Sequence, residues 1–478
     1  MRRSVMFRSV LIANRGEIAV RIARTCRELG IGVHAVYSTE DRYSRIVRMA
    51  DEAVQIGPAP ARRSYLNIPA IIEAARRTGA EAIHPGYGFL SENADFAEVC
   101  HAQGITFIGP PADVIERMGD KMAARQLMAA AGLPLLPGSV EPVQSVAEAE
   151  ALANEIGYPV MLKAVAGGGG RGIRIVRDPA DLAEGYRTVE ANAKLLFGDG
   201  RLYVERYLPR ARHVEVQILA DAVGNVIHLG ERDCSVQRRH QKLVEEAPAP
   251  RLSPETVAQL RQAAVRGAKA ARYVGAGTFE FLVDDAENIY FLEVNCRIQV
   301  EHPVTEMVTG VDLVAEQLRI AAGEPLRLRQ EDVRLTGVAI ECRVNVEDPE
   351  RGFIPAPGTL SEFEPPAGPF VRVDTHGFPG YRVPTAYDSL LAKVIAWGPD
   401  RESALRRMRR ALAEFTISGD GVATTIPFAA RILTDPEFRE ARHDTSLIAR
   451  LIAEDAAAAA AGSSQARAAR ADRPTVRV

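Results

Sequence analysis

The sequence predicts an α/β protein of several domains, with an open parallel sheet first and mixed α+β domains after it. Short apolar runs alternate with helix-period segments between residues 10 and 83, which is the pattern of a parallel sheet covered by helices. A glycine-rich segment at 166–172 lies between two short apolar runs. The chain of 478 residues is long enough for about three domains.

Composition and charge exclude several classes of protein. The formal net charge is −3, so the charge balance predicts no binding to nucleic acid or to an anionic membrane. No apolar run is long enough to span a bilayer, and none follows the basic start as in a secretion signal. The five cysteines are scattered without C-x-x-C spacing. This predicts a cytoplasmic protein with neither a structural zinc nor a disulfide framework.

The first predicted domain spans residues 1–118. Strands are expected at 10–13, 31–36 and 80–83, and helices at 18–29 and 68–78. The G-x-G-x-x-G pattern is absent after the first strand, so the fingerprint of a dinucleotide-binding site is not present. The motif His-Pro-Gly-Tyr-Gly-Phe at 84–89 follows a strand, at the edge where such sheets bind ligands. It fits a ligand contact and a simple turn equally well.

The second predicted domain spans residues 119–330 and opens with a helix at Lys121. A lysine there opposes the helix dipole, so Lys121 is either a solvated side chain or a phosphate ligand. Strand 159–165, the glycines and strand 173–176 predict a strand–loop–strand lid whose backbone N–H groups can approach an anion. Lys163 lies inward enough to reach a phosphate, and a flexible linker is the weaker alternative.

Two further strands are expected at 203–208 and 212–218. The second places His213 on its polar side, and the strand pattern alone does not make this histidine a ligand. The following segment, 231–242, is dense in charge without helix or strand period. A solvated loop is one interpretation, and an anion site for a small substrate fits the length of the segment better. Nucleic-acid binding is disfavoured because no aromatic residues interleave with the basic ones.

The most informative stretch is 291–303. Read as an extended chain, it places five polar side chains on one face: Glu293, Asn295, Arg297, Gln299 and Glu301. Its apolar residues face the other way, and Pro303 is expected to end the strand pairing. A solvated strand face is the plain alternative, but so regular a row of carboxylates, amides and a guanidinium favours a site.

The preceding strand, 278–283, is expected to pair with this one as a hairpin in which Asp284 faces Ile289. That register places Glu280 directly across from Glu293, at a repulsive cost of roughly 0.2–1 kcal/mol that a bound cation would remove. Oxygen-only ligands suit Mg²⁺ or Mn²⁺. The hairpin therefore predicts a metal site made of Glu280, Glu293 and Asn295, completed by substrate phosphates.

The third predicted domain spans residues 331–450. A strand is expected at 337–346 with Arg343 on its polar face, followed by an apolar strand beginning near 387 and a helix at 401–415. Residues 451–478 are rich in alanine and arginine and offer few apolar side chains for packing. They are predicted to form a disordered tail.

Together the motifs resemble those of the biotin carboxylases of the ATP-grasp superfamily, over about residues 10–438. The shared motifs are Ala-Asn-Arg-Gly-Glu-Ile at 13–18, the motif at 84–93, Met-Gly-Asp-Lys at 118–121, the glycine-rich lid, 231–242, 295–306 and Ala-Ile-Glu-Cys-Arg at 339–343. The runs at 238–242 and 297–303 are particular to biotin-dependent carboxylases. Cys296 departs from the family, which often has Thr there, and is expected to change packing only.

The resemblance implies a fold and a reaction. The fold would be a Rossmann-like N-terminal sheet, an ATP-grasp domain with a mobile glycine-rich lid at about 136–208, and a C-terminal biotin carboxylase domain. The reaction would convert ATP, bicarbonate and carrier-bound biotin into ADP, phosphate and carboxybiotin, through carboxyphosphate. The cofactors would be ATP and Mg²⁺ or Mn²⁺. The chain would act as a cytoplasmic homodimer with a biotin carboxyl carrier protein and carboxyltransferase subunits, without carrying biotin itself.

The resemblance also implies roles for individual residues. ATP would be bound by Lys121, Lys163, Gly168, Gly169, Gly170, Glu205, Leu208, His213, Gln237, His240, Glu280 and Glu293. Bicarbonate would be held by Lys242, Arg297, Gln299 and the N–H of Val300. Glu301 would be the base that removes its proton. Arg343 would stabilise the biotin oxyanion, and Tyr87 would contact biotin. The catalytic set would thus be Lys242, Arg297, Glu301 and Arg343.

Two alternatives stay open on the sequence. Another ATP-grasp carboxylate–amine ligase would share the lid and the metal carboxylates but would not require the run at 238–242. A non-catalytic subunit that only binds ATP would have no need of Glu301, Lys242 and Arg343. The molecule finally carboxylated is chosen by a separate transferase.

Overall fold

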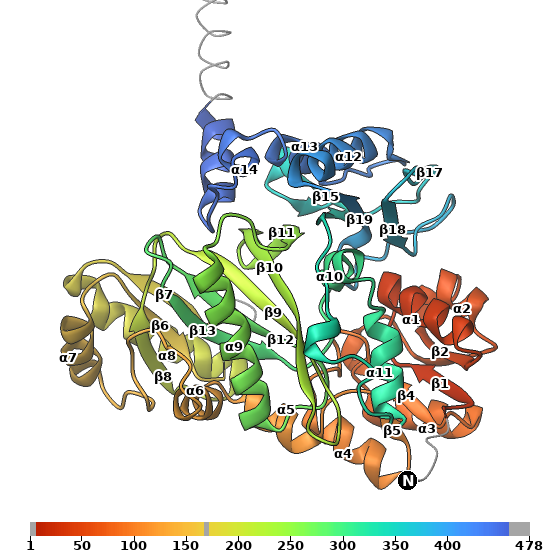
Figure 1. Ribbon diagram of the computed structural model, residues 1–478, viewed down its shortest axis with the longest axis horizontal. Coiled ribbons are helices and arrows are strands. Elements are labelled where there is room, and N and C mark those ends of the chain that lie inside the picture. The colour runs from red at the N-terminus through yellow and green to blue at the C-terminus, as the bar shows by residue number, and fades with distance from the viewer. Residues whose placement is uncertain (1–5, 167–171, 458–478) are drawn as a thin grey trace, which may run out of the picture.

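The computed structural model describes residues 6–166 and 172–457. The predicted ATP-binding glycines Gly168, Gly169 and Gly170 lie outside these residues. The chain forms an N-terminal parallel sheet, a long antiparallel sheet and a small lid sheet. Figure 1 shows the N-terminal part (red and orange) and the lid (gold) on opposite sides of the central region (green), with the C-terminal helices (blue) above.

The N-terminal part is an open parallel sheet, as predicted, with strand order β3-β2-β1-β4-β5. The strands are β1 (Ser9–Ile12), β2 (Gly32–Ser38), β3 (Glu52–Gly57), β4 (Ala82–His84) and β5 (Thr106–Phe107). The helices are α1 (Gly16–Glu28), α2 (Arg45–Met49), α3 (Ile68–Thr78) and α4 (Ala94–Ala102). Val10, Leu11 and Ile12 are fully buried, as expected of a parallel strand covered on both faces.

One antiparallel sheet runs through both of the following predicted domains, in the order β13-β12-β9-β10-β11-β14-β19-β18. Its strands are β9 (Arg212–Ala220), β10 (Val226–Arg238), β11 (Gln241–Ala247), β12 (Gly275–Val283), β13 (Ile289–Asn295), β14 (Val338–Asn345), β18 (Val371–Thr375) and β19 (Leu390–Gly398). Val244 on β11 lies opposite Cys342 on β14. The sheet therefore crosses the predicted boundary at 330/331 and brings Arg343 next to the strand that carries Lys242.

A separate three-stranded sheet forms the predicted lid. Strand β6 (Val160–Ala164) lies between β7 (Ile173–Val176) and β8 (Leu202–Arg206), and helices α7 (Val146–Ile156) and α8 (Leu182–Phe197) share its apolar core. Lys163 lies opposite Ile173 in the β6–β7 ladder. The two strands are therefore paired, and the flexible-linker alternative is wrong.

The charge-dense segment 231–242 is not a solvated loop. It forms most of β10 and the start of β11, and its residues from 231 to 235 are buried. The charges pair with neighbouring strands: the Arg232 guanidinium, fully buried, lies 2.5 Å from a carboxylate oxygen of Glu215. Buried charges need such partners, and a one-dimensional pattern of residue types cannot show them.

The β12–β13 hairpin has the predicted carboxylate pair and one correction to its register. Glu280 lies opposite Glu293, but Val283, and not Asp284, lies opposite Ile289. The ladder contains a β-bulge with one extra residue in β13 between these pairs. The bulge compensates for a turn that is one residue longer than the predicted pairing allows.

The predicted polar strand ends early. β13 ends at Asn295, and helix α10 (His302–Thr309) begins seven residues later. Pro303 lies in the first turn of α10, where proline is tolerated because its missing N–H would have no helical partner. The residues between, which we name the 296–301 loop, have bent backbone.

The remaining helices cover the long sheet and its C-terminal extension. They are α5 (Ala112–Gly119), α6 (Lys121–Ala130), α9 (Pro254–Ala271), α11 (Leu313–Ala321), α12 (Arg401–Glu414), α13 (Ile426–Ile432) and α14 (Pro436–Arg439). Short strand pairs are formed by β15 (Glu347–Asp348) with β16 (Ile354–Pro355) and by β17 (Glu362–Glu364) with β20 (Thr416–Ser418). Across the described residues, every helix is too short or too polar to cross a membrane.

The predicted disordered tail begins too early. Residues 447–457 are helical, and Leu451 is buried. Glu454 pairs with Arg450 at 2.8 Å and with Arg431 at 3.1 Å. These contacts order the chain up to residue 457, and residues 458–478 lie outside the described part.

Candidate active site

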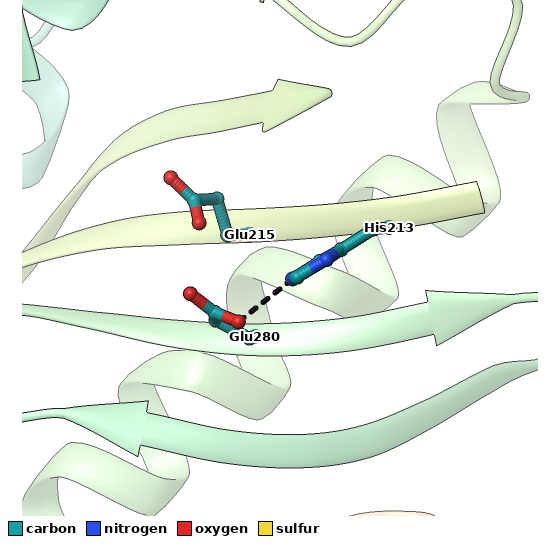
Figure 2. A group of neighbouring side chains, drawn as sticks. All are labelled: His213, Glu215 and Glu280. Carbon is teal, nitrogen blue, oxygen red and sulfur yellow. Dashed lines mark hydrogen bonds and ion pairs between the residues drawn. The ribbon is translucent and has the colours of Figure 1, made fainter. Parts of the chain in front are cut away.

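Two neighbouring strands of the long sheet place three ionisable side chains together. His213 and Glu215 come from β9, and Glu280 comes from β12, opposite Glu215. Figure 2 shows the three side chains on one face of the sheet, with His213 Nε2 2.7 Å from Glu280 Oε2. Burial lowers the pKa of His213, but the Glu280 carboxylate outweighs burial and raises it above the usual value. His213 therefore favours its charged form.

Lys242 on β11 extends into the same cluster. Its Nζ lies 2.6 Å from Glu215, 3.0 Å from Glu280 and 2.6 Å from Glu301. Burial acts against the charge, but these carboxylates, together with the nearby Cys234, raise the pKa of Lys242 well above its usual value. Lys242 is thus a permanent cation at the centre of the cluster.

Glu301 lies between two cations at the end of the 296–301 loop. It is fully buried, with Lys242 at one oxygen and Arg343 Nη2 2.9 Å from the other. Burial raises the pKa of Glu301, but Lys242 and Arg343 act against burial and leave it below the usual value. Arg343 is held in turn by Glu245 at 2.6 Å. Glu301 is therefore an ionised carboxylate, ready to accept a proton.

Arg297 orders the start of the 296–301 loop. Its guanidinium donates to Asn295 Oδ1 at 2.9 Å, to Gln299 Oε1 at 2.8 Å and to Glu92 at 2.8 Å. Gln299 in turn donates to Glu280 at 3.1 Å. The alternate side chains predicted to share one strand face therefore do converge, through bent backbone and side-chain hydrogen bonds.

The predicted ATP ligands divide between the lid and the sheet. In the lid, Lys163 Nζ lies 2.6 Å from Glu205, which also accepts from Arg125 at 3.1 Å. Lys121 follows Asp120, the N-cap of α6. Burial and the nearby Lys163 lower the pKa of Lys121, against the pull of Glu293. Lys121 and Lys163 are thus close enough for their charges to repel each other.

The other predicted ATP ligands differ in how far they are buried. Gln237 Nε2 lies 3.2 Å from His213 Nδ1. Leu208 is half-buried beyond the end of β8, and His240 is exposed in the turn between β10 and β11. The hydroxyl of Tyr87, the predicted biotin contact, donates to Glu17 in the N-terminal part. Burial raises the pKa of Tyr87 well above its usual value, and the Arg343 guanidinium acts against this rise.

The carboxylates of the hairpin fit the predicted metal set. Glu293 is exposed, and among the described residues its carboxylate has no ion-pair partner. Glu280 faces it and accepts from the Asn295 amide at 2.8 Å. The two opposed carboxylates and the side-chain oxygen of Asn295 are the kind of oxygen ligands that suit Mg²⁺ or Mn²⁺, although His213 and Lys242 also contact Glu280. The alternative group of His213, Glu215 and Glu280 is also close enough to bind an ion. In this group the Lys242 ammonium already contacts both carboxylates.

Sequence reasoning missed four charged residues that complete the site. Glu92 binds Arg297, Glu215 binds Lys242, Glu245 binds Arg343, and Arg232 binds Glu215. The available signal was weak: Glu215 shares the polar side of β9 with His213, and Glu245 is a carboxylate in an apolar run. Their role depends on strands that are distant in sequence.

Two of the buried carboxylates face each other beside the site. Glu245 on β11 lies opposite Glu341 on β14. Among the described residues neither oxygen of Glu341 has a hydrogen-bond partner. Burial raises the pKa of Glu341 well above its usual value, and it raises the pKa of Glu245 to about 7 against the pull of Arg343. The pair therefore holds a proton near neutral pH, with Glu341 uncharged.

Replacing Glu341 with Gln is expected to stabilise the protein at alkaline pH. The folded pKa of Glu341 is raised, so the unfolded chain ionises first, at about pH 4.3, and wild-type stability falls as the pH rises toward the folded pKa. Glutamine does not ionise, so the variant does not lose stability in this way. The difference in the free energy of unfolding between variant and wild type should widen by up to about 1.4 kcal/mol per pH unit. Denaturant unfolding of both proteins across this range tests the expectation. A constant difference would mean that Glu341 is ionised in the folded protein.

The paired strand–loop–strand lid and the opposed carboxylates of β12 and β13 define an ATP-grasp protein. Residues 120–329 match the family model for the carbamoyl-phosphate synthase L chain, ATP binding domain. Residues 6–115 match the biotin carboxylase N-terminal domain, and residues 341–450 match the biotin carboxylase C-terminal domain. The chain belongs to the biotin carboxylase family.

Relatives and solved structures agree with this assignment. The chain is 55% identical over 442 residues to a biotin carboxylase of Nostoc sp., covering 92% of this chain and 98% of that protein. It is 53% identical to biotin carboxylase 1 of Bacillus subtilis, covering 93% and 98%. These matches confirm the family inferred from the motifs.

Two solved structures share the fold over almost the whole chain. A Campylobacter jejuni biotin carboxylase complex with β,γ-ATP has a TM-score of 0.90 at 48% identity, covering 93% of this chain and 99% of that one. The biotin carboxylase domain dimer of Hydrogenobacter thermophilus 2-oxoglutarate carboxylase, with MgADP, ADP and bicarbonate, has a TM-score of 0.89 at 52% identity, covering 92% and 97%. The predicted three-part architecture is therefore confirmed.

Proposed function

We propose that this chain is the biotin carboxylase component of a biotin-dependent carboxylase. It would use ATP and bicarbonate to carboxylate biotin on a separate carrier protein. The observation that carries the proposal is the buried array of Lys242, Glu301 and Arg343, in which one ionised carboxylate lies between two cations. A base beside anion-binding groups is what bicarbonate activation requires.

In the first half-reaction the chain binds ATP and bicarbonate side by side. Lys121 and Lys163 bind the phosphates, and the backbone near Leu208 binds the adenine. Glu280, Glu293 and Asn295 would hold Mg²⁺, which neutralises phosphate charge when it is bound. The other predicted ATP ligands are Gly168, Gly169, Gly170, Glu205, His213, Gln237 and His240.

Bicarbonate is held by Lys242, Arg297, Gln299 and the N–H of Val300. Glu301 takes the bicarbonate proton, and the resulting carbonate oxygen attacks the γ-phosphorus as the bond to ADP breaks. The products are carboxyphosphate and ADP. Glu301 is ionised before bicarbonate arrives, because Lys242 and Arg343 hold its pKa below the usual value. Positioning and charge neutralisation supply most of the acceleration.

In the second half-reaction carboxyphosphate breaks into CO₂ and phosphate. The trianionic phosphate takes the N1′ proton of biotin, and the nitrogen then attacks CO₂. Negative charge develops on the ureido oxygen, and the Arg343 guanidinium stabilises it. Tyr87 contacts biotin from the N-terminal side. The carrier protein delivers biotin, and a carboxyltransferase consumes the carboxybiotin.

The decisive test is ADP release from the purified chain with and without bicarbonate, together with carboxylation of free biotin. We expect both activities to require bicarbonate. A carboxylate–amine ligase would release ADP only with another carboxylate and an amine, and an ATP-binding scaffold would release none. Either of these results would replace the proposed function.

Replacing Glu293 with Gln is expected to raise the Mg²⁺ concentration needed for ATP cleavage. The variant removes one of the two metal carboxylates and leaves Glu280 in place. Because Glu293 is exposed and unpaired among the described residues, the melting temperature without metal should not fall, as substitutions at such positions change stability by only about 0.5 kcal/mol. Full activity at low Mg²⁺ would contradict the metal assignment.

We also propose the assembly expected of this component. The chain would form a homodimer in the cytoplasm and would not itself carry biotin. Support comes from the Hydrogenobacter thermophilus domain, which was crystallised as a dimer. Light scattering of the purified chain at micromolar concentration measures this directly.

A further inference from the structure

A lysine with no access to solvent lies where the three parts of the chain meet. Lys393 is in the middle of β19, opposite Arg343 on β14, and its side chain is 0% exposed. A buried ammonium is retained only where partners compensate for lost hydration. Its Nζ lies 2.7 Å from the carbonyl oxygen of Val300 and 3.1 Å from Glu17 Oε1. Asp374 on β18 is more distant, at 4.0 Å.

These contacts join three regions that are distant in sequence. Glu17 is in helix α1 of the N-terminal part, where it also accepts from the Tyr87 hydroxyl. Val300 is in the 296–301 loop of the central part. Lys393 itself belongs to the C-terminal part. Its ammonium is therefore a contact between the loop and the two terminal parts.

The carbonyl that Lys393 binds has no alternative partner in regular structure. β13 ends before the loop and α10 begins after it, so no strand ladder or helix turn binds Val300. The preceding carbonyl, of Gln299, lies 2.7 Å from Nδ1 of the buried His302. Two consecutive carbonyls are thus each bound by a side chain, and that of Gln299 also accepts from the backbone N–H of His302 at 3.4 Å. An irregular loop needs such contacts to satisfy its backbone polar groups.

The two peptide groups orient groups of the proposed bicarbonate site. The peptide held by His302 carries the N–H of Val300. The peptide held by Lys393 leads directly into Glu301. A rotation of the second peptide would turn the Glu301 carboxylate away from Lys242 and Arg343.

We propose that Lys393 is a positioning residue for bicarbonate activation, which fixes the 296–301 loop through the Val300 carbonyl with Glu17 as its counter-ion. The inference rests on the proposed function of this site. Lys393 does not touch bicarbonate or biotin in this scheme; it acts through the orientation of the backbone beside Glu301.

The test compares Lys393→Met with a double variant, Glu17→Gln/Lys393→Met. Methionine keeps the length and apolar stem of lysine but cannot bind the carbonyl. Alone it leaves Glu17 buried without its cation, so stability should fall. The double variant removes both charges and should recover the melting temperature. Arg401→Met is the matched control, because Arg401 also joins the C-terminal part to the central part, through Glu246 at 2.8 Å, away from the loop.

We expect both Lys393 variants to lower kcat/KM for bicarbonate by about 100-fold, the typical effect of misplacing a reacting group by about 1 Å. The KM for ATP should not change, and Arg401→Met should keep the wild-type kcat/KM for bicarbonate. If Lys393→Met does not fold, the double variant alone gives the answer.

A double variant that recovers kcat/KM for bicarbonate along with its melting temperature would overturn the inference, since Lys393 would then only balance the charge of Glu17. An equal loss in Arg401→Met would do the same, because any weakened contact between parts would suffice. Wild-type protein without bicarbonate-dependent ADP release would instead refute the proposed function itself.

Discussion

Replacing Glu301 with Gln is expected to abolish bicarbonate-dependent ADP release and biotin carboxylation together. Glutamine keeps the size of glutamate and can accept from one of Lys242 and Arg343 through its single amide oxygen, but it cannot take the bicarbonate proton. Loss of a general base typically costs about 10²–10⁴-fold in rate. Both activities should fall by this amount, because carboxyphosphate must form before biotin can be carboxylated. ADP release and carboxybiotin measured on the same sample give the two values.

A loss of stability has to be distinguished from a loss of chemistry. Glu301 is buried between two cations, so its neutralisation also disturbs charge balance. Glu245→Gln is a matched control, because it neutralises another buried carboxylate bound to Arg343 but lies outside the bicarbonate set. Because Glu245 acts on the site only through Arg343, this variant should lower bicarbonate-dependent ADP release far less than Glu301→Gln. Glu301→Gln with wild-type ADP release would show that another group is the base.

The part of the site that could be predicted lies within local patterns. The alternation from Glu293 to Glu301 indicated a common site although the strand ends at Asn295. The hairpin placed Glu280 opposite Glu293 in spite of a one-residue error near the turn. In both cases side-chain types spaced two apart marked the correct face, and small backbone irregularities did not change which groups meet.

The part that could not be predicted depends on pairing between distant strands. A solvated loop stayed open for the segment 231–242 beside an anion site, because its charges are compensated by residues such as Glu215, which lie on another strand. In the sequence Lys393 is one lysine within an apolar strand. Only the fold places its ammonium beside the carbonyl of Val300. Tertiary pairing decides whether a charge is solvated or buried, and residue pattern alone does not contain it.

Replacing Arg343 with Ala is expected to separate the two half-reactions. Arg343 would stabilise the oxyanion of biotin, which develops only after ATP has been cleaved. Removing such a group typically costs about 2.7–4 kcal/mol, or roughly 10²–10³ in rate. Carboxylation should fall by this amount, while ADP release falls less, so that ATP is consumed without product.

Some loss of ADP release is expected in Arg343→Ala, because Arg343 also forms an ion pair with the proposed base, Glu301. Arg343 Nη2 lies 2.9 Å from the carboxylate and is one of the groups that lower its pKa. Without it the pKa of Glu301 should rise, which removes ionised base at acidic pH, whereas Lys242 still holds the other oxygen. The deficit in ADP release should therefore shrink as pH increases, and the deficit in carboxylation should persist. Parallel pH profiles of the two activities decide the matter: equal losses at every pH would mean that Arg343 organises bicarbonate or ATP and has no separate role toward biotin.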